Sequence, residues 1–318
     1  MAFKLEVVPE KAIVVRRGKT IVSASWFGPA VVRPYVYPFL GPYGRELTRL
    51  DHPQDPVGHS HHRSIWIGHA DAGGVDFWSD RGDSGRIVQH GVSEIVAAGA
   101  AVGALLDCAW LAPDGRRLLR ERRRLTWTDA ARGELVLDLD STLEAATEPV
   151  VLGRTNFGLH GIRIARTMRV HDGLGGLVVN SSEAENEAGC FGQHAEWCDA
   201  SGPVPLGFDP DAATDVARPP FTGTLPAAIV GVACFAHPRD FDGGALWHVR
   251  DDGWFGPGVS RGESRRIEPG TPLRARVRIV GHLGRSSDAR IAERYLEWRA
   301  EVTGTTPHRS SDAVPKKP

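Results

Sequence analysis

Short runs of apolar and β-branched residues, separated by turn-forming residues, dominate the chain and predict strands. Val-, Leu- and Thr-rich segments alternate with clusters of Gly, Pro, Asp and Asn, at residues 91–102, 118–128, 134–142, 162–170, 177–180, 228–236 and 273–280. Residues 12–15 and 20–26 form a predicted hairpin around Arg17-Gly18-Lys19. In RERRRLTWTD, residues 120–129, polar and apolar residues alternate in places, as in a strand with one solvent-facing side.

One helix is predicted, over residues 287–302. An apolar stripe at helical spacing marks it, made by Ile291, Tyr295, Leu296, Trp298 and Val302. Many strands and one terminal helix predict an all-β fold, a single large antiparallel β-sandwich over residues 1–303 with the helix packed outside. Residues 304–318 are polar and contain Pro, and we expect a disordered tail there.

Composition narrows the class of function. The net charge of -1 gives no basic excess for binding nucleic acid or an anionic membrane. No stretch approaches the ~20 apolar residues of a membrane span, and the N-terminus lacks the pattern of a secretory signal. The four cysteines form no CxxC pair, which fits reduced thiols. We expect a cytoplasmic protein whose partner is a small molecule, with the oligomeric state left open.

Residues 58–78, GHSHHRSIWIGHADAGGVDFW, concentrate four of the thirteen histidines. In an extended strand His59 and His61 would share one face and could present two imidazoles to one metal ion. His69 and Asp76 could complete a site for Zn, Mn or Fe. The alternative is a structural corner in which the imidazoles bond to backbone and carboxylate groups.

Other segments add residues suited to sugar chemistry. Residues 33–49 combine aromatic rings with three Arg, which suits sugar rings and their hydroxyl groups. Glu196 lies between Ala and Trp, where a carboxylate could act with His61 or His62 as a general acid or base; a salt bridge to an Arg is the alternative. The candidate substrate-binding residues are Arg33, Tyr35, Arg49, Arg63, Asn156, His160, His194, His248 and Arg250.

The segments RPYVYPFLGPYGRELTR, HSHHRSIWIGHADAGGVDFW, GRIVQHG, GLHGIRIARTM, AEWCDASG and RIVGHLG, in this order, resemble the bacterial PmoA-like family, labelled "methane oxygenase PmoA". The HPRD-to-WHVRDDGW block belongs to the same pattern, and the resemblance covers residues 33–284. The resemblance implies a β-supersandwich similar to that of galactose mutarotase. It also implies a role in carbohydrate metabolism, because genes of the family often lie beside genes of sugar enzymes. The membrane subunit that shares the label spans the bilayer several times, whereas this chain has no such stretch.

Three functions follow as hypotheses. The first is an enzyme that acts on a sugar or keto-sugar by general acid/base chemistry, as an isomerase, lyase or hydrolase. The second is a metal-dependent activity, such as the oxygenase of the family label. The third is a carbohydrate-binding protein without catalysis, because the same rings and guanidinium groups serve binding equally well.

Overall fold

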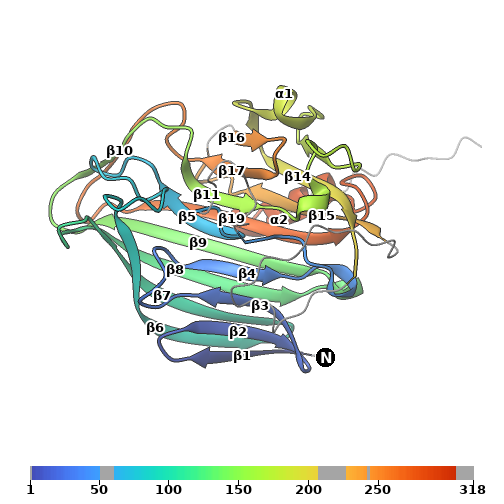
Figure 1. Ribbon diagram of the computed structural model, residues 1–318, viewed down its shortest axis with the longest axis horizontal. Coiled ribbons are helices and arrows are strands. Elements are labelled where there is room, and N and C mark those ends of the chain that lie inside the picture. The colour runs from blue at the N-terminus through green and yellow to red at the C-terminus, as the bar shows by residue number, and fades with distance from the viewer. Residues whose placement is uncertain (1, 51–60, 207–226, 242–243, 306–318) are drawn as a thin grey trace, which may run out of the picture.

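A computed structural model describes residues 2–50, 61–206, 227–241 and 244–305 (Figure 1). Two large antiparallel sheets form two layers that overlap in this view and share the main core, and α2 (Ile291–Thr303) packs on the second of them. The large antiparallel β-sandwich with a C-terminal helix is therefore confirmed.

The first sheet has nine strands and carries the candidate site. Their spatial order is β1 (Phe3–Val8), β2 (Ala12–Arg17), β3 (Thr20–Trp26), β4 (Tyr35–Phe39), β5 (Ile65–His69), β11 (Gly158–Arg163), β17 (Trp254–Gly258), β16 (Ala245–Arg250) and β13 (His194–Ala195).

The second sheet has eight strands. Their spatial order is β12 (Leu177–Asn180), β14 (Trp197–Val204), β15 (Ala228–Ala236), β19 (Leu273–Leu283), β9 (Leu135–Ala145), β8 (Arg117–Asp129), β7 (Ala101–Leu111) and β6 (Arg86–Ala98). Strands β10 (Val150–Leu152) and β18 (Arg265–Ile267) pair separately. The short helices are α1 (Asn186–Cys190), η1 (Pro42–Gly44), η2 (Ala131–Gly133) and η3 (Arg166–Met168).

The strand alternation in β8 buries a charge pair between the sheets. Leu119, Leu125 and Trp127 are buried with the core, and Glu121 and Arg123 follow the same alternation. The Arg123 guanidinium donates to Glu121 from Nε at 2.7 Å and from Nη2 at 2.8 Å. The Glu121 carboxylate is thus neutralised inside the sandwich.

Two further donors complete the shell of this carboxylate. Trp110 Nε1 and Ser141 Oγ each donate to it at 2.8 Å. Burial by itself would raise the pKa of Glu121, but Arg123 and these donors hold it below its ordinary value. The carboxylate therefore stays ionised in the core.

Several predicted elements differ from the observed ones at their ends. Residues 91–102 span the end of β6 and the start of β7, so the predicted strand contains a hairpin turn in which Gly99 has φ 59°. Residues 162–170 hold only the end of β11, followed by η3. Helix α2 begins at Ile291 because Arg290 is left-handed, with φ 54°.

The remaining elements add two corrections. Leu296 is 46% exposed, so it does not belong to the buried face of α2, and α1 is a second α-helix that the pattern did not predict. Beyond Thr305 the predicted tail lies outside the described residues. Within the described part of the chain, no helix is both long and apolar enough to cross a membrane.

Candidate functional site

The outer face of the nine-stranded sheet, turned away from the second sheet, carries aromatic residues. Ile65 and Ile67 point into the main core, whereas Trp66 between them belongs to a separate cluster. Tyr35 and Gly161 are the partners of Trp66 on the two neighbouring strands. Because directly paired residues share a face, this part of the sheet presents Trp66 between a Tyr and a Gly.

Trp66, Trp78, Trp254, His62 and His248 form one packed group, which we call the aromatic cluster. The ring centroids of His62 and Trp66 lie 5.0 Å apart with planes at 21°, and His248 lies 3.9 Å from Trp254. Trp78 lies 5.2 Å from Trp66 and 5.4 Å from Trp254. None of the five is more than 4% exposed. One histidine from residues 58–78 is thus joined to one from β16.

A glycine makes room for this packing. A side chain at Gly161 would place its Cβ 2.3 Å from the Trp66 ring, so the indole lies directly over the β11 backbone. The segment before β5 also matters, because Ser64 has φ 56°, so the backbone between His62 and β5 is not continuously extended. The backbone bend separates Arg63 from the strand and leaves His62 against Trp66.

Two indole donors in the aromatic cluster have no hydrogen-bond partner in the described part of the chain. Trp66 Nε1 and Trp78 Nε1 are buried, and no hydrogen-bond acceptor for either lies among the described residues. A buried donor without an acceptor costs free energy unless water or a ligand supplies one. The two buried N–H groups are therefore donors that the described residues leave unsatisfied.

Arginines border the aromatic cluster. Arg163 and Arg250 are both sheet partners of Trp254, so all three lie on the same face. Arg163 pairs with Asp252 at 3.0 Å, and Arg250 pairs with Glu187 of α1 at 2.8 Å.

Two more arginines extend this border. The Arg63 guanidinium lies 5.6 Å from the ring centroid of Tyr35, and the backbone N–H of Arg49 donates to the carbonyl of Arg163 at 3.0 Å. The predicted substrate-binding residues Tyr35, Arg63 and Arg250 thus lie around one face, and Arg49 adjoins it through its backbone.

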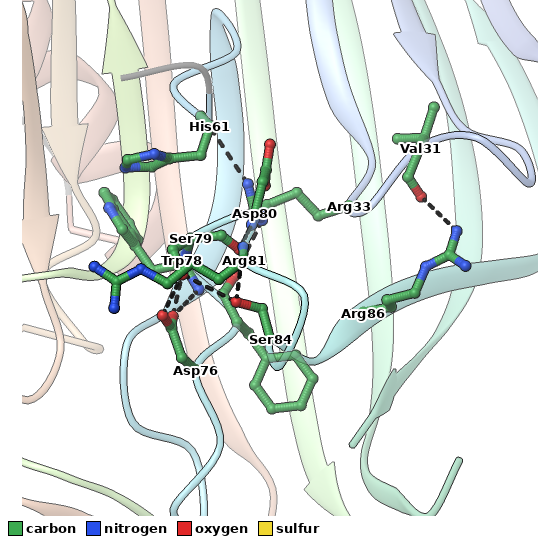
Figure 2. A network of polar contacts seen from close by, with 11 residues as sticks. Val31, Arg33, His61, Asp76, Trp78, Ser79, Asp80, Arg81, Ser84 and Arg86 are labelled. Carbon is green, nitrogen blue, oxygen red and sulfur yellow. Dashed lines mark hydrogen bonds and ion pairs between the residues drawn. The ribbon is translucent and has the colours of Figure 1, made fainter. Parts of the chain in front are cut away.

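Arg33 lies beneath this face and holds the loop after β5 (Figure 2). It is 2% exposed and donates to the carbonyls of His61 at 3.3 Å, Phe77 at 3.0 Å and Ser79 at 2.5 Å. Its Nη2 also pairs with Asp80 at 2.7 Å. Arg33 therefore orients the backbone around His61 and Trp78, although the sequence predicted it to bind substrate.

The donors predicted to hold a metal have protein partners. His69 accepts from the N–H of Asp71 at Nδ1 (3.0 Å), so its Nε2 carries the proton and donates to Ser260 Oγ (2.7 Å). Asp76 accepts from the backbone N–H groups of Trp78 and Ser79 and from the Ser79 hydroxyl. These two side chains do not fit a metal in this arrangement.

Other potential ligands give no complete site. Among the residues the structure describes, no three His, Cys, Asp or Glu side chains form a group that could bind a metal ion. The predicted ligand His59 lies outside those residues, while His61 is half-buried at the edge of the aromatic cluster, with its ring centroid 4.3 Å from that of His62.

Two other predicted residues, His248 and His160, face opposite sides of the sheet. His248 Nδ1 donates to the carbonyl of Asn156 at 2.9 Å, which leaves Nε2 as an acceptor, and burial lowers the pKa of His248 to about 3. His160 pairs with Ile67 and points into the core, where neither ring nitrogen has a partner among the described residues. Burial lowers its pKa to about 4. Asn156 contacts the site only through its backbone carbonyl, which accepts from His248, and His160 lies on the opposite side of the sheet from the site.

Glu196 is separated from the predicted catalytic histidines. Its carboxylate pairs with Arg299 of α2 at 2.9 Å, and both side chains are about half exposed. Helix α2 packs on Trp197 and neighbours in a cluster distinct from the aromatic cluster. His194 is exposed, and its Nδ1 lies 3.0 Å from the Gly244 carbonyl. Glu196 lies between β13 and β14 and belongs to neither strand.

Phe157, Phe191 and Arg261 also contact the site and were not predicted. Phe157 and Phe191 approach His248 at 5.4 Å and 5.0 Å, and Arg261 stacks on Phe191 at 4.0 Å. Phe157 directly follows the candidate Asn156 in the sequence, which was the one signal that could have pointed to it.

Comparison with known proteins gives little functional information. No curated protein matches the chain. Among solved structures, the GalM/aldose epimerase homologue from C. elegans is similar at a TM-score of 0.35 and 9% identity, over 89% of this chain and 99% of that one. Residues 28–296 match a defined family. The chain belongs to that family, described as "Family of unknown function (DUF6807)".

Proposed function

We propose that the protein binds a carbohydrate over the aromatic cluster and acts on it by general acid/base chemistry. The observation that carries this proposal is the pair of buried indole N–H groups, Trp66 Nε1 and Trp78 Nε1, without acceptors among the described residues. Ligand sites combine apolar walls with a few placed polar groups, and a sugar offers both apolar C–H faces and hydroxyl acceptors. Arg63 and Arg250 at the border add donors for further hydroxyl groups.

We assign different roles to two histidines of the site, His248 and His61. His248 is neutral with Nε2 as its acceptor, and its low pKa suits holding a substrate hydroxyl better than removing a proton at neutral pH. His61 is only half-buried and touches His62, so it is the imidazole that could exchange a proton with substrate. The reaction class that we propose is isomerisation, elimination or hydrolysis of a sugar or keto-sugar.

A sugar titration tests the binding proposal. Trp78→Phe removes one N–H and keeps an aromatic ring, so it should weaken binding roughly 2- to 10-fold, the value of one hydrogen bond. The matched control is Trp298→Phe, because Trp298 is equally buried but packs in the cluster under α2. Tryptophan fluorescence and calorimetry across a panel of aldoses, ketoses and keto-sugars measure the sugar affinity of each of the two variants. Equal affinity of the two variants for every sugar that binds would refute the proposal.

Turnover tests the catalytic proposal. NMR of the same panel reports isomerisation, elimination and hydrolysis directly. His61→Gln should lower turnover roughly 10²- to 10⁴-fold while sugar affinity changes little, because it removes the exchanging proton. Full turnover by His61→Gln would remove His61 from the mechanism.

Sugar binding without catalysis is the second candidate. The separation of Glu196 from the aromatic cluster and the low pKa of His248 favour it, since neither group then serves as a general base. Binding in the panel with no product from any bound sugar would decide for this candidate.

A further inference from the structure

A cavity of about 330 Å³ is lined in part by β16 and β17, the two strands that also carry His248 and Trp254 of the aromatic cluster. Its lining includes Leu246 and Gly258, which are paired across β16 and β17. Leu246 is two residues from His248 on β16, so the two share the outer face and lie ~6.6 Å apart along the strand. The Phe191 ring contacts His248 on one side and the Arg261 guanidinium on the other. Arg261 lines the cavity, so Phe191 connects His248 with the cavity wall.

The Arg261 guanidinium is held in a fixed place beside this cavity. It stacks on the Phe191 ring at 4.0 Å, and its Nη1 donates to the Trp247 carbonyl at 3.0 Å. A Cβ at Gly192, which has φ 74°, would lie 2.9 Å from Nη2 of Arg261. The glycine thus leaves space for the guanidinium, and an aromatic face orients it.

Charge is balanced around the cavity except at Arg261. Glu263 pairs with Arg265 at 3.3 Å, and Asp240 pairs with Arg276 at 2.6 Å. For Arg261 the described residues supply no carboxylate. Burial lowers the pKa of Arg261, and a cation that loses water without gaining an anion is stabilised by an anionic ligand.

We propose that this cavity binds the anionic group of an acidic carbohydrate, with Arg261 as its charged partner. The inference rests on the proposed function and names its substrate class: a sugar that carries a carboxylate or a phosphate. The ring would lie over the aromatic cluster near His248, and the anion would reach past Phe191 to the free edge of the guanidinium. Planar bidentate pairing favours a carboxylate.

Four probes test the inference: D-glucose, D-glucuronate, D-galacturonate and D-glucose 6-phosphate. Calorimetry on the whole chain at constant ionic strength measures each affinity. We expect an acidic sugar to bind roughly tenfold or more tightly than glucose, the value of a charge-assisted hydrogen bond. Arg261→Gln should abolish that preference, and Arg261→Lys should retain part of it because the charge remains. The matched control is Arg266→Gln, an exposed Arg that pairs with Glu268 outside the cavity.

The outcomes separate the two proposals. Tighter binding of the uronates identifies a carboxylate, and tighter binding of the 6-phosphate identifies a phosphate. Equal affinity for glucose and the three acidic sugars overturns the anion site and leaves sugar binding intact. An acidic preference that survives Arg261→Gln, or is lost equally in Arg266→Gln, also overturns it. A chain that binds none of the four overturns both this inference and the proposed function.

Discussion

The charge pair of Glu121 and Arg123 inside the sandwich gives a quantitative prediction for Arg123→Met. The substitution removes the two guanidinium bonds at 2.7 Å and 2.8 Å and leaves Glu121 with donors from Trp110 and Ser141. Breaking a buried pair on one side costs about 3–5 kcal/mol. The two remaining donors solvate the carboxylate in part, so we expect the lower end, a loss of about 3 kcal/mol in the free energy of unfolding.

A second substitution tests whether the loss of stability in Arg123→Met comes from the unpaired charge of Glu121. Trp110 donates to Oε2 and Ser141 to Oε1 of Glu121. Glu121→Gln removes the charge, and its amide oxygen can accept from Trp110 while its NH2 group donates to the Ser141 hydroxyl, so the double variant should be more stable than Arg123→Met alone. Urea unfolding followed by tryptophan fluorescence and circular dichroism measures each variant. The control is Arg124→Met, since Arg124 is exposed and pairs with Glu94 at the surface; we expect its midpoint to match the wild type. A double variant less stable than Arg123→Met would refute the reasoning.

Three further predictions concern pH, Glu196 and metal. Burial lowers the pKa of His69 and His160 to about 4 and of His248 to about 3, so the unfolded chain binds more protons as pH falls below the ordinary histidine pKa. Stability should then fall between about pH 6.5 and pH 4, by up to roughly 1.4 kcal/mol per pH unit for each histidine; a melting temperature equal at pH 7 and pH 5 would contradict this. Glu196→Gln should change the free energy of unfolding by less than about 1 kcal/mol, because its pair with Arg299 is half exposed, and a larger loss in urea unfolding would show a deeper role. Elemental analysis after incubation with Zn, Mn or Fe and desalting should find less than one metal ion per chain; a stoichiometric ion would restore the predicted metal site.

The sequence predicted most strands because alternation is a local property. In β8 the exposed and buried residues follow the period of two, and β2 and β3 form the predicted hairpin around Gly18. The same alternation also places Glu121 and Arg123 inside the sandwich. The sequence did not predict this, because charged residues are normally assigned to the solvent-facing side. Backbone breaks were not predictable in this way: left-handed residues at Ser64 and Arg290 end regular runs without a Gly or Pro to mark them.

The candidate site was predictable by segment but not by contact. Residues 58–78 and 237–258 were both selected, and the structure joins them through His62, Trp254 and His248. Their meeting depends on the pairing of β11 with β17, which no local pattern specifies. Glu196 was wrongly grouped with the catalytic histidines because no local pattern shows that its partner is Arg299 of α2. Arg261 was missed because the Phe191 ring on which it stacks comes from a distant segment.

The contact of Trp66 with Gly161 has a consequence for folding. Side chains alternate, so a slip of β11 by one residue against β5 would place His160 or Ile162 under the indole in place of Gly161. Neither side chain fits there, so mispaired intermediates could not assemble the aromatic cluster. The cluster thus acts as a checkpoint on strand register, and its fluorescence should appear only in the last, correctly paired step of refolding.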